Sequence, residues 1–310
     1  MPLFNEEHQI RMKAFEWLEE QTQLHGEVLP RDLLAKGFEF RNTRIHMLGA
    51  QGIWKPRVFE RIPLSITTVP NGPYADHFDY DDNVVYSYRG TDPSHPDNVG
   101  LRQAMKEQTP LIYFFGVEKG RYLPFWPVFV TRDEPQQLRC HVDISARFIQ
   151  SFQGAMAASE DGNVEDVEPE LVRKYAVKMS KVRLHQTAFR ERVIGAYRCS
   201  CAMCNLKHRE LLDAAHITPD KEKAGEPVVS NGLSLCKIHH TAYDKHILGI
   251  SPDYKIHIRE DILREIDGPM LRHGLQELHG HKLEHLPSRK VHRPDRDRLQ
   301  HRFERFLHAG

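Results

Sequence analysis

Four soft metal ligands in two closely spaced pairs constrain this chain more than any other feature. The first pair is Cys201 and Cys204 and the second is Cys236 and His239, with two residues between the members of each pair. Three thiolates and one imidazole make a donor set that a closed tetrahedral zinc site takes. Because four protein ligands leave no position for water or substrate, such a zinc serves folding and not chemistry.

Cysteine usage also predicts the compartment. Three of the five cysteines stand in this ligand set, and a reducing environment keeps thiolates free to bind metal. We therefore expect a cytoplasmic protein. Cys199 lies two residues before Cys201 and could replace it only by changing the loop between the ligands, so we interpret Cys199 as a spare thiol.

A second set of polar residues, His216, Asn231 and His240, lies inside this zinc frame. Their motifs are Leu212-Asp213-Ala214-Ala215-His216-Ile217, Ser230-Asn231-Gly232-Leu233 and His239-His240-Thr241-Ala242-Tyr243-Asp244. These motifs resemble the HNH endonucleases, in whose ββα-metal fold two strands and a helix surround one catalytic cation. The resemblance implies that His216 is the general base, that Asn231 braces the loop between the strands, and that His240 binds the catalytic metal.

Elementary chemistry gives a reason for the implied base and metal. An imidazole with a pKa of about 6.5 is largely neutral at neutral pH, so His216 could accept a proton from water as that water attacks phosphorus. A divalent cation on the scissile phosphate, Mg²⁺ or Mn²⁺, offsets the charge that builds on the leaving oxygen. This cation needs an open coordination sphere, so it is distinct from the zinc of the closed site.

The second protein ligand of the catalytic metal is left open by the sequence. In many family members the residue before the base is a His or Asp that shares the metal, whereas this chain has Ala215. Asp213, on the same presumed strand, could take that place. Asp244 could also do so, because it follows His240 by four residues and lies on the same helix face. Of the two, the sequence favours Asp213.

The N-terminal half has the pattern of a β-rich domain. Short runs of β-branched and aromatic residues are bounded by Pro, Gly, Asn and Asp clusters, which is typical of strands. Residues 98–108 are expected to form a helix, and residues 1–21 to form an amphipathic surface helix. The predicted strands lie within residues 62–68, 84–88, 111–115 and 125–130.

Two segments of this half resemble the SRA domain, a curved β-barrel of PUA-like fold that reads modified cytosine by flipping it out of the duplex. They contain Gly72-Pro73-Tyr74-Ala75-Asp76 and Tyr86-Ser87-Tyr88-Arg89-Gly90. The resemblance implies that Tyr74 and Tyr88 stack on the flipped base and that Asp76 accepts a hydrogen bond from its exocyclic amine. Tyr86 is an alternative to Tyr88, and Asp79 is an alternative to Asp76.

The order of these regions is similar to that of the bacterial SRA-HNH modification-dependent restriction endonucleases. We therefore expect an α+β chain with an SRA-like domain at residues 1–157, an acidic linker at 158–172, and an HNH endonuclease domain with a structural zinc at 173–310. The resemblance implies recognition of 5-methylcytosine in double-stranded DNA by base flipping, followed by metal-dependent hydrolysis of phosphodiester bonds. Because one HNH site cuts one strand at a time, we also expect a homodimer.

Charge and hydropathy add two expectations. The formal net charge is zero, but acidic residues gather in 160–170 and basic residues in 173–192. DNA affinity depends on local cations and not on the sum, so the basic segment is a candidate phosphate contact. No apolar stretch reaches the length of about eighteen residues that a membrane span needs, so we expect no membrane partner.

Two other functions compete with this interpretation. One is a catalytically silent, zinc-stabilised module that binds modified DNA, which Ala215 favours and the retained His216, Asn231 and His240 oppose. The other is the same nuclease reading hydroxymethylcytosine or another mark. Near the C-terminus, apolar residues at helical spacing from Leu299 to Leu307 predict a helix that packs on the nuclease domain or on a second subunit.

Overall fold

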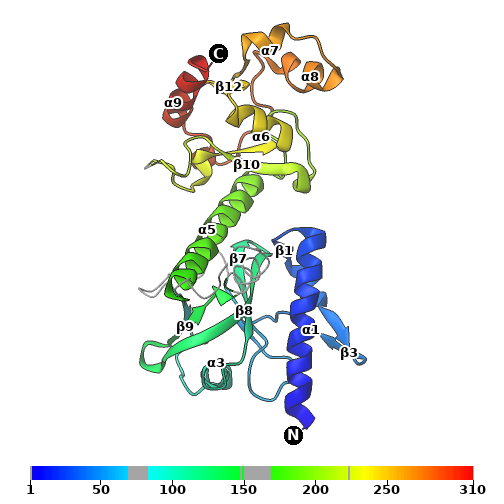
Figure 1. Ribbon diagram of the computed structural model, residues 1–310, viewed down its shortest axis with the longest axis vertical. Helices are drawn as coiled ribbons and strands as arrows, with labels where there is room; N and C mark the ends of the chain where they lie inside the picture. The colour runs from blue at the N-terminus through cyan, green and yellow to red at the C-terminus, as the bar shows by residue number, and fades with distance from the viewer. Residues whose placement is uncertain (1, 69–82, 147–148, 150–168, 223, 310) are drawn as a thin grey trace, which may run out of the picture. The chain divides into compact units, whose positions relative to one another are not determined.

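The computed structural model describes residues 2–68, 83–146, 149, 169–222 and 224–309 (Figure 1). The chain divides into two compact units, Met1–Leu184 and His185–Gly310, and the division falls inside helix α5 (Pro169–Ala196). Residues 169–172 of the predicted linker therefore belong to a helix, while residues 158–168 lie outside the described part of the chain. The predicted domain boundaries stay predictions.

A curled, mostly antiparallel sheet forms the first unit (Figure 1). The longest strand, β8 (Arg121–Glu134), pairs with β7 and β1 through its first half and with β9 through its second. Register shifts between Val130 and Arg132 and between Leu111 and Tyr113 bend these pairings, as β-bulges do. The remaining strands are β1 (Leu29–Pro30), β4 (Ile53–Trp54), β5 (Ser65–Thr67), β6 (Val84–Ser87), β7 (Leu111–Glu118) and β9 (Arg139–Asp143).

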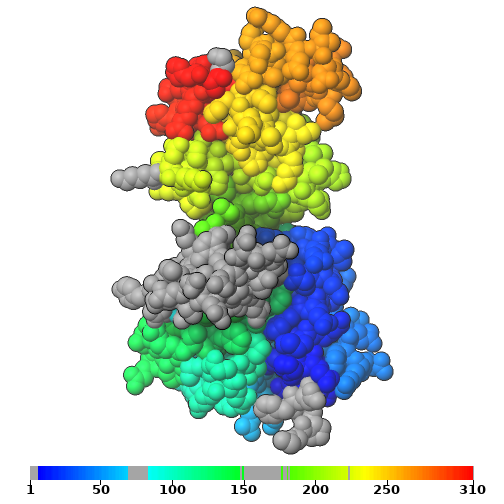
Figure 2. Space-filling model, in the orientation of Figure 1, coloured from blue at the N-terminus to red at the C-terminus, as the bar shows by residue number. Residues whose placement is uncertain are grey.

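Both helices that the sequence predicts for this half are present, and they pack on the sheet. Helix α1 (Pro2–His25) buries Ile10, Ala14 and Leu18, which are spaced four residues apart, and forms part of the surface of the unit (Figure 2). Helix α3 (Pro96–Lys106) packs on β8 through buried side chains that include Leu101. The smaller elements are α2 (Arg31–Lys36), β2 (Phe38–Phe40), β3 (Thr43–Ile45) and the 3₁₀ turn Pro135–Gln137.

The second unit contains the two strands and one helix that the HNH-like motifs predict. Strand β10 (Leu212–His216) pairs with β11 (Gly232–Cys236) in antiparallel register, so that His216 lies opposite Gly232. Helix α6 (Lys237–Asp244) follows β11 directly and contacts both strands. The C-terminal half of α5 packs against this pair through Phe189 and Val193, which belong to the same hydrophobic core.

The C-terminal residues pack on this core. Helix α9 (Arg296–Leu307) buries Leu299 and Phe306 and contacts β12 (Leu248–Ile250), which confirms the predicted packing of this helix on the second unit. No helix in the described ranges is long and apolar enough to cross a membrane. The other elements are β13 (Ile256–Ile258), α7 (Glu260–Arg264), α8 (Pro269–Gly274) and the 3₁₀ turns Arg209–Leu211, Val229–Asn231, Gln276–Leu278 and Lys290–His292.

Candidate functional site

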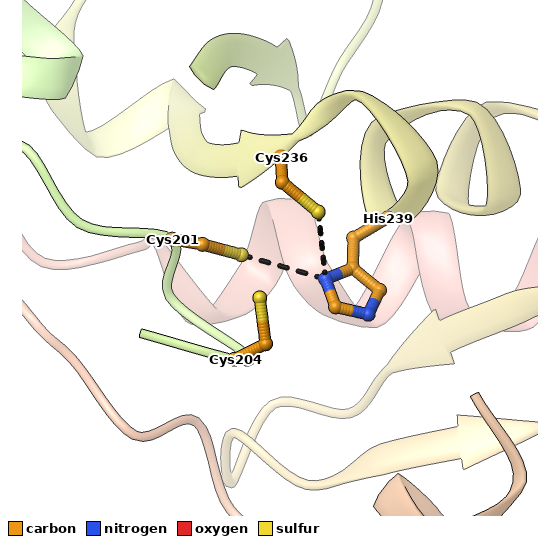
Figure 3. A group of neighbouring side chains, drawn as sticks. All are labelled: Cys201, Cys204, Cys236 and His239. Carbon is orange, nitrogen blue, oxygen red and sulfur yellow. Dashed lines mark hydrogen bonds between the residues drawn. The ribbon is translucent and has the colours of Figure 1, made fainter. Parts of the chain in front are cut away.

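The four predicted zinc ligands converge in the second unit (Figure 3). Their ligand atoms all lie within 4.8 Å of one another, and three of the four residues are buried. Cys201 and Cys204 come from the loop after α5, Cys236 ends β11, and His239 lies in the first turn of α6. Because α6 follows β11 directly, Cys236 and His239 lie together beside the loop that carries Cys201 and Cys204.

The imidazole of His239 is oriented as in a zinc site. Its Nδ1 lies 3.4 Å from Sγ of Cys201 and 3.2 Å from Sγ of Cys236, while Nε2 lies 2.7 Å from the carbonyl oxygen of Gly274. A carbonyl that accepts from one ring nitrogen leaves the other free to bind metal, which is the usual arrangement of a histidine ligand. This donor set fits zinc. Cys199 lies outside the group and accepts a hydrogen bond from Arg209.

His216 lies at the end of β10 with its ring stacked on Phe189 of α5. The ring centroids are 4.1 Å apart and the planes differ by 18°. Burial lowers the pKa of His216 below its ordinary value, so the imidazole is neutral at neutral pH. Its Nε2 atom is buried and, within the described part of the chain, has no hydrogen-bond partner. A neutral imidazole is suited to accept a proton.

His240 lies between two carboxylates on α6 and β10. Its Nδ1 is 3.4 Å from Oδ2 of Asp213, and its Nε2 is 3.2 Å from Oδ2 of Asp244. Hydrogen bonds to Asp213 and Asp244 raise the pKa of His240 to about 9. The side chain therefore carries a proton at neutral pH, and a metal ion bound at one ring nitrogen would replace that proton.

The two carboxylates differ in their partners. Asp213 forms ion pairs with Lys237 at 2.8 Å and with Arg190 at 3.4 Å. Burial by itself would raise the pKa of this carboxyl, but its hydrogen bonds to His240 and Lys237 hold the pKa well below its usual range. The side chain of Asp244 is 52% exposed, against 28% for Asp213. Both carboxylates have cationic neighbours, but Asp213 is the more buried of the two and Asp244 is more open to solvent. Ala215 is completely buried in the hydrophobic core.

Asn231 closes the loop between β10 and β11. Its Oδ1 accepts from the backbone N–H of Thr218 at 2.8 Å, and its Nδ2 donates to the carbonyls of Thr218 and Glu226, each at 3.0 Å. The carbonyl of Asn231 also accepts from the N–H of Ile217 at 2.9 Å. Because Asn231 is fully buried, losing its side chain would leave buried backbone groups without partners. These are the contacts that a bracing residue needs.

Gly232 allows α5 to approach the strands, and a methyl group there is expected to be costly. A Cβ at this position would lie 2.4 Å from Cγ2 of Val193 and 2.9 Å from Cζ of Phe189. Gly232→Ala should therefore destabilise the second unit by about 1–3 kcal/mol, as overpacking does. Urea unfolding measures this cost. Gly274→Ala is the matched control, since a Cβ there meets nothing within 4 Å, and equal stability of the two variants would contradict the prediction.

The candidate base-pocket residues are described only in part. Tyr74, Asp76 and Asp79 lie outside the described residues. Tyr88 is buried, and its hydroxyl donates to Asp133, whose other oxygen accepts from Nε of Arg102 at 2.7 Å. Burial, together with the bond to Asp133, raises the pKa of Tyr88 to about 12.

The alternative to Tyr88 has a different partner. Tyr86 is also buried, and its hydroxyl donates to the carbonyl of Thr67 at 3.4 Å. The stacking roles of Tyr88 and Tyr86 stay predictions.

Several supporting side chains escaped the sequence interpretation. Phe189 and Arg190 were visible only as part of a basic helical segment, yet they contact His216 and Asp213. Arg302, from α9, lies 3.6 Å from Oδ1 of Asp244. No local spacing relates these residues to the HNH-like motifs. The only sequence signal was the helical pattern of apolar residues on α5 and α9, which indicates the face of each helix that packs on the rest of the unit.

Comparison with known proteins identifies the class of this site. Residues 201–251 match the HNH endonuclease family, a range that begins at the first zinc-type cysteine and includes β10, β11, α6 and β12. The second unit therefore contains an HNH endonuclease domain. No curated protein matches the chain.

Among solved structures, the chain is similar to one titled "Modification dependent TagI restriction endonuclease". The two sequences are 21% identical, and the match covers 78% of this chain and 81% of that chain. The TM-score is 0.27.

Proposed function

We propose that this protein is a modification-dependent DNA endonuclease. Its HNH site would hydrolyse phosphodiester bonds in double-stranded DNA, and its first unit would recognise 5-methylcytosine. The observation that carries the proposal is that the matched HNH domain contains both a neutral, half-buried His216 and the ion pair of His240 with Asp244. A silent DNA-binding module would need neither a neutral imidazole at the end of β10 nor an exposed carboxylate beside a second histidine.

His240 and Asp244 are the residues that we propose hold the catalytic cation. Asp213 accepts a hydrogen bond from Nδ1 of His240, and Nε2 of the same ring faces Asp244. In many metal sites a carboxylate outside the coordination sphere orients a histidine ligand in this way. The geometry therefore favours Asp244 over Asp213 as the second ligand. An imidazole and a carboxylate suit Mg²⁺ or Mn²⁺, with water and phosphate in the remaining positions. The bound cation would offset the negative charge that develops on the phosphate oxygens.

The chain's own residues would do the proton chemistry. His216 would accept a proton from the attacking water, and its stacking on Phe189 would keep the ring in one orientation during that transfer. Asn231 would hold the loop that follows His216 through its bonds to Thr218 and Glu226. Lys237, more than half exposed and next to Asp213, would offer a cation to the DNA backbone.

Recognition of the modified base is proposed for the curled sheet of the first unit. The support is the SRA-like sequence at Tyr74–Asp76 and Tyr86–Tyr88 together with a bulged, curved sheet that carries the second of these segments. A flipped cytosine could stack on Tyr74 and on Tyr88 or Tyr86 while Asp76 binds its amine edge. We propose 5-methylcytosine as the mark and a homodimer as the form that breaks both strands.

The test is cleavage of matched duplexes that differ only in cytosine methylation. We expect purified protein to cut the methylated duplex in the presence of Mg²⁺ or Mn²⁺ and to leave the unmethylated duplex intact. A chelator should abolish cutting, and a hydroxymethylated duplex shows whether the pocket accepts a larger group. Cutting of both duplexes would remove the proposed reader, and selective binding without cutting would remove the proposed nuclease.

A further inference from the structure

Helix α9 presents three arginines at helical spacing to the rest of the second unit. Arg298 donates to the carbonyl of Ala224 and lies 3.4 Å from Glu226, while Arg305 binds both carboxylate oxygens of Glu222 at 2.5 and 2.9 Å. These two arginines hold the loop between β10 and β11 from outside. The third, Arg302, lies between them on the helix and reaches α6 instead. All three lie beyond residues 201–251.

Arg302 differs from its neighbours in burial. It is only 9% exposed, and its guanidinium lies over the ring of Tyr243, 5.0 Å from the centroid. Its Nη2 donates at 3.2 Å to the carbonyl of Tyr243 in the last turn of α6, and this carbonyl also accepts from the backbone N–H of His246. Within the described part of the chain, Nε of Arg302 has no hydrogen-bond partner. A buried guanidinium is costly unless it is paired, so this placement calls for a counter-charge.

The counter-charge is Asp244. Oδ1 of Asp244 lies 3.6 Å from Nη2 of Arg302, and Oδ2 lies 3.2 Å from Nε2 of His240. The two carboxylate oxygens therefore have separate neighbours. With Oδ1 on the side of the arginine, Oδ2 faces the imidazole nitrogen of His240.

We propose that Arg302 is a positioning residue of the catalytic-metal site and that α9 thereby completes the nuclease. Arg302 would orient Asp244 as Asp213 orients His240. Both proposed metal ligands lie on α6, and each would then have one supporting residue from another element, Arg302 of α9 or Asp213 of β10. This inference rests on the proposed function. Burial argues against the competing role of phosphate binding, because a side chain with 9% exposure offers no face to DNA.

The experiment compares Arg302→Met and Arg302→Lys with Arg298→Met in the full chain. Arg298→Met is the matched control, since it removes an arginine from the same helix face without touching Asp244. Mn²⁺ binding is measured by calorimetry on zinc-loaded protein, and cleavage is measured at several DNA and Mn²⁺ concentrations. Zinc content and thermal unfolding show whether each variant is folded.

We expect Arg302→Met to bind Mn²⁺ about 10–100-fold more weakly, as is typical when an outer-shell partner is lost. The KM for DNA should stay unchanged, and excess Mn²⁺ should restore most of the cleavage rate. Arg302→Lys keeps the positive charge but loses the planar guanidinium, so its Mn²⁺ affinity should lie between that of the parent and that of Arg302→Met. Arg298→Met should bind Mn²⁺ within about twofold of the parent, because a partly exposed ion pair contributes little.

The outcomes separate this inference from the proposed function. A parent protein that binds no Mn²⁺ and cuts no DNA overturns both. A parent that binds and cuts, with folded Arg302 variants that bind Mn²⁺ as tightly as the parent or more tightly, overturns only the role of Arg302. If Arg302→Met loses zinc and does not fold, Arg302→Lys decides the question by the same comparison.

Discussion

His216→Ala is expected to lower the rate of DNA cleavage by about 10²–10⁴-fold, the usual contribution of a general base. Binding of the methylated duplex should be preserved, because His216 is proposed to contact water and not the modified base. Single-turnover cleavage at saturating metal measures the loss, and a gel-shift assay measures binding. His285→Ala is a suitable control, since His285 is also half-buried in this unit with an unpartnered Nε2 among the described residues.

The pH dependence of cleavage gives a second readout for the same residue. The base has to be neutral, and burial lowers the pKa of His216 below its ordinary value of about 6.5. At saturating metal, which displaces the proton of His240, cleavage should therefore stay constant at neutral pH and fall only as the pH drops below about 6.5. Loss of rate already above pH of about 7 would contradict this assignment, as would a His216→Ala variant that cuts at the parental rate.

Cys236→Ser is expected to unfold the second unit. A structural zinc can contribute about 10–16 kcal/mol to folding, which is as large as the whole stability of about 5–15 kcal/mol of an ordinary domain. Cys236 is buried and joins β11 to α6, so its loss would remove a ligand and release the helix that carries His240. Metal analysis should show less zinc, and thermal unfolding should lose the transition of this unit.

Cys199→Ser is the matched control for this variant. Cys199 lies two residues before Cys201, but its thiol binds Arg209 and stands outside the ligand group. The control should keep its zinc and unfold like the parent. A Cys236→Ser protein that is folded, free of zinc and normally stable would show that the cluster is not a scaffold.

Part of the secondary structure of the first unit follows from local sequence. The run Leu111–Phe115 and the helical spacing of Ile10, Ala14 and Leu18 predict a strand and a helix because apolar periodicity is a local property. The full length of β8 was not predicted. Its pairing partners change along the strand, and such a change depends on residues far away in the sequence.

The sequence by itself predicted the four candidate zinc ligands and the His216, Asn231 and His240 series, because residue type and short spacing are enough to suggest both. Only the tertiary structure distinguished the two candidate carboxylates. Asp213 pairs with cations from α5 and α6, and Asp244 lies open beside His240 with Arg302 of α9 behind it. Burial and charge pairing decide which carboxylate is available to a metal, and both depend on contacts between residues distant in the chain, which no local pattern encodes.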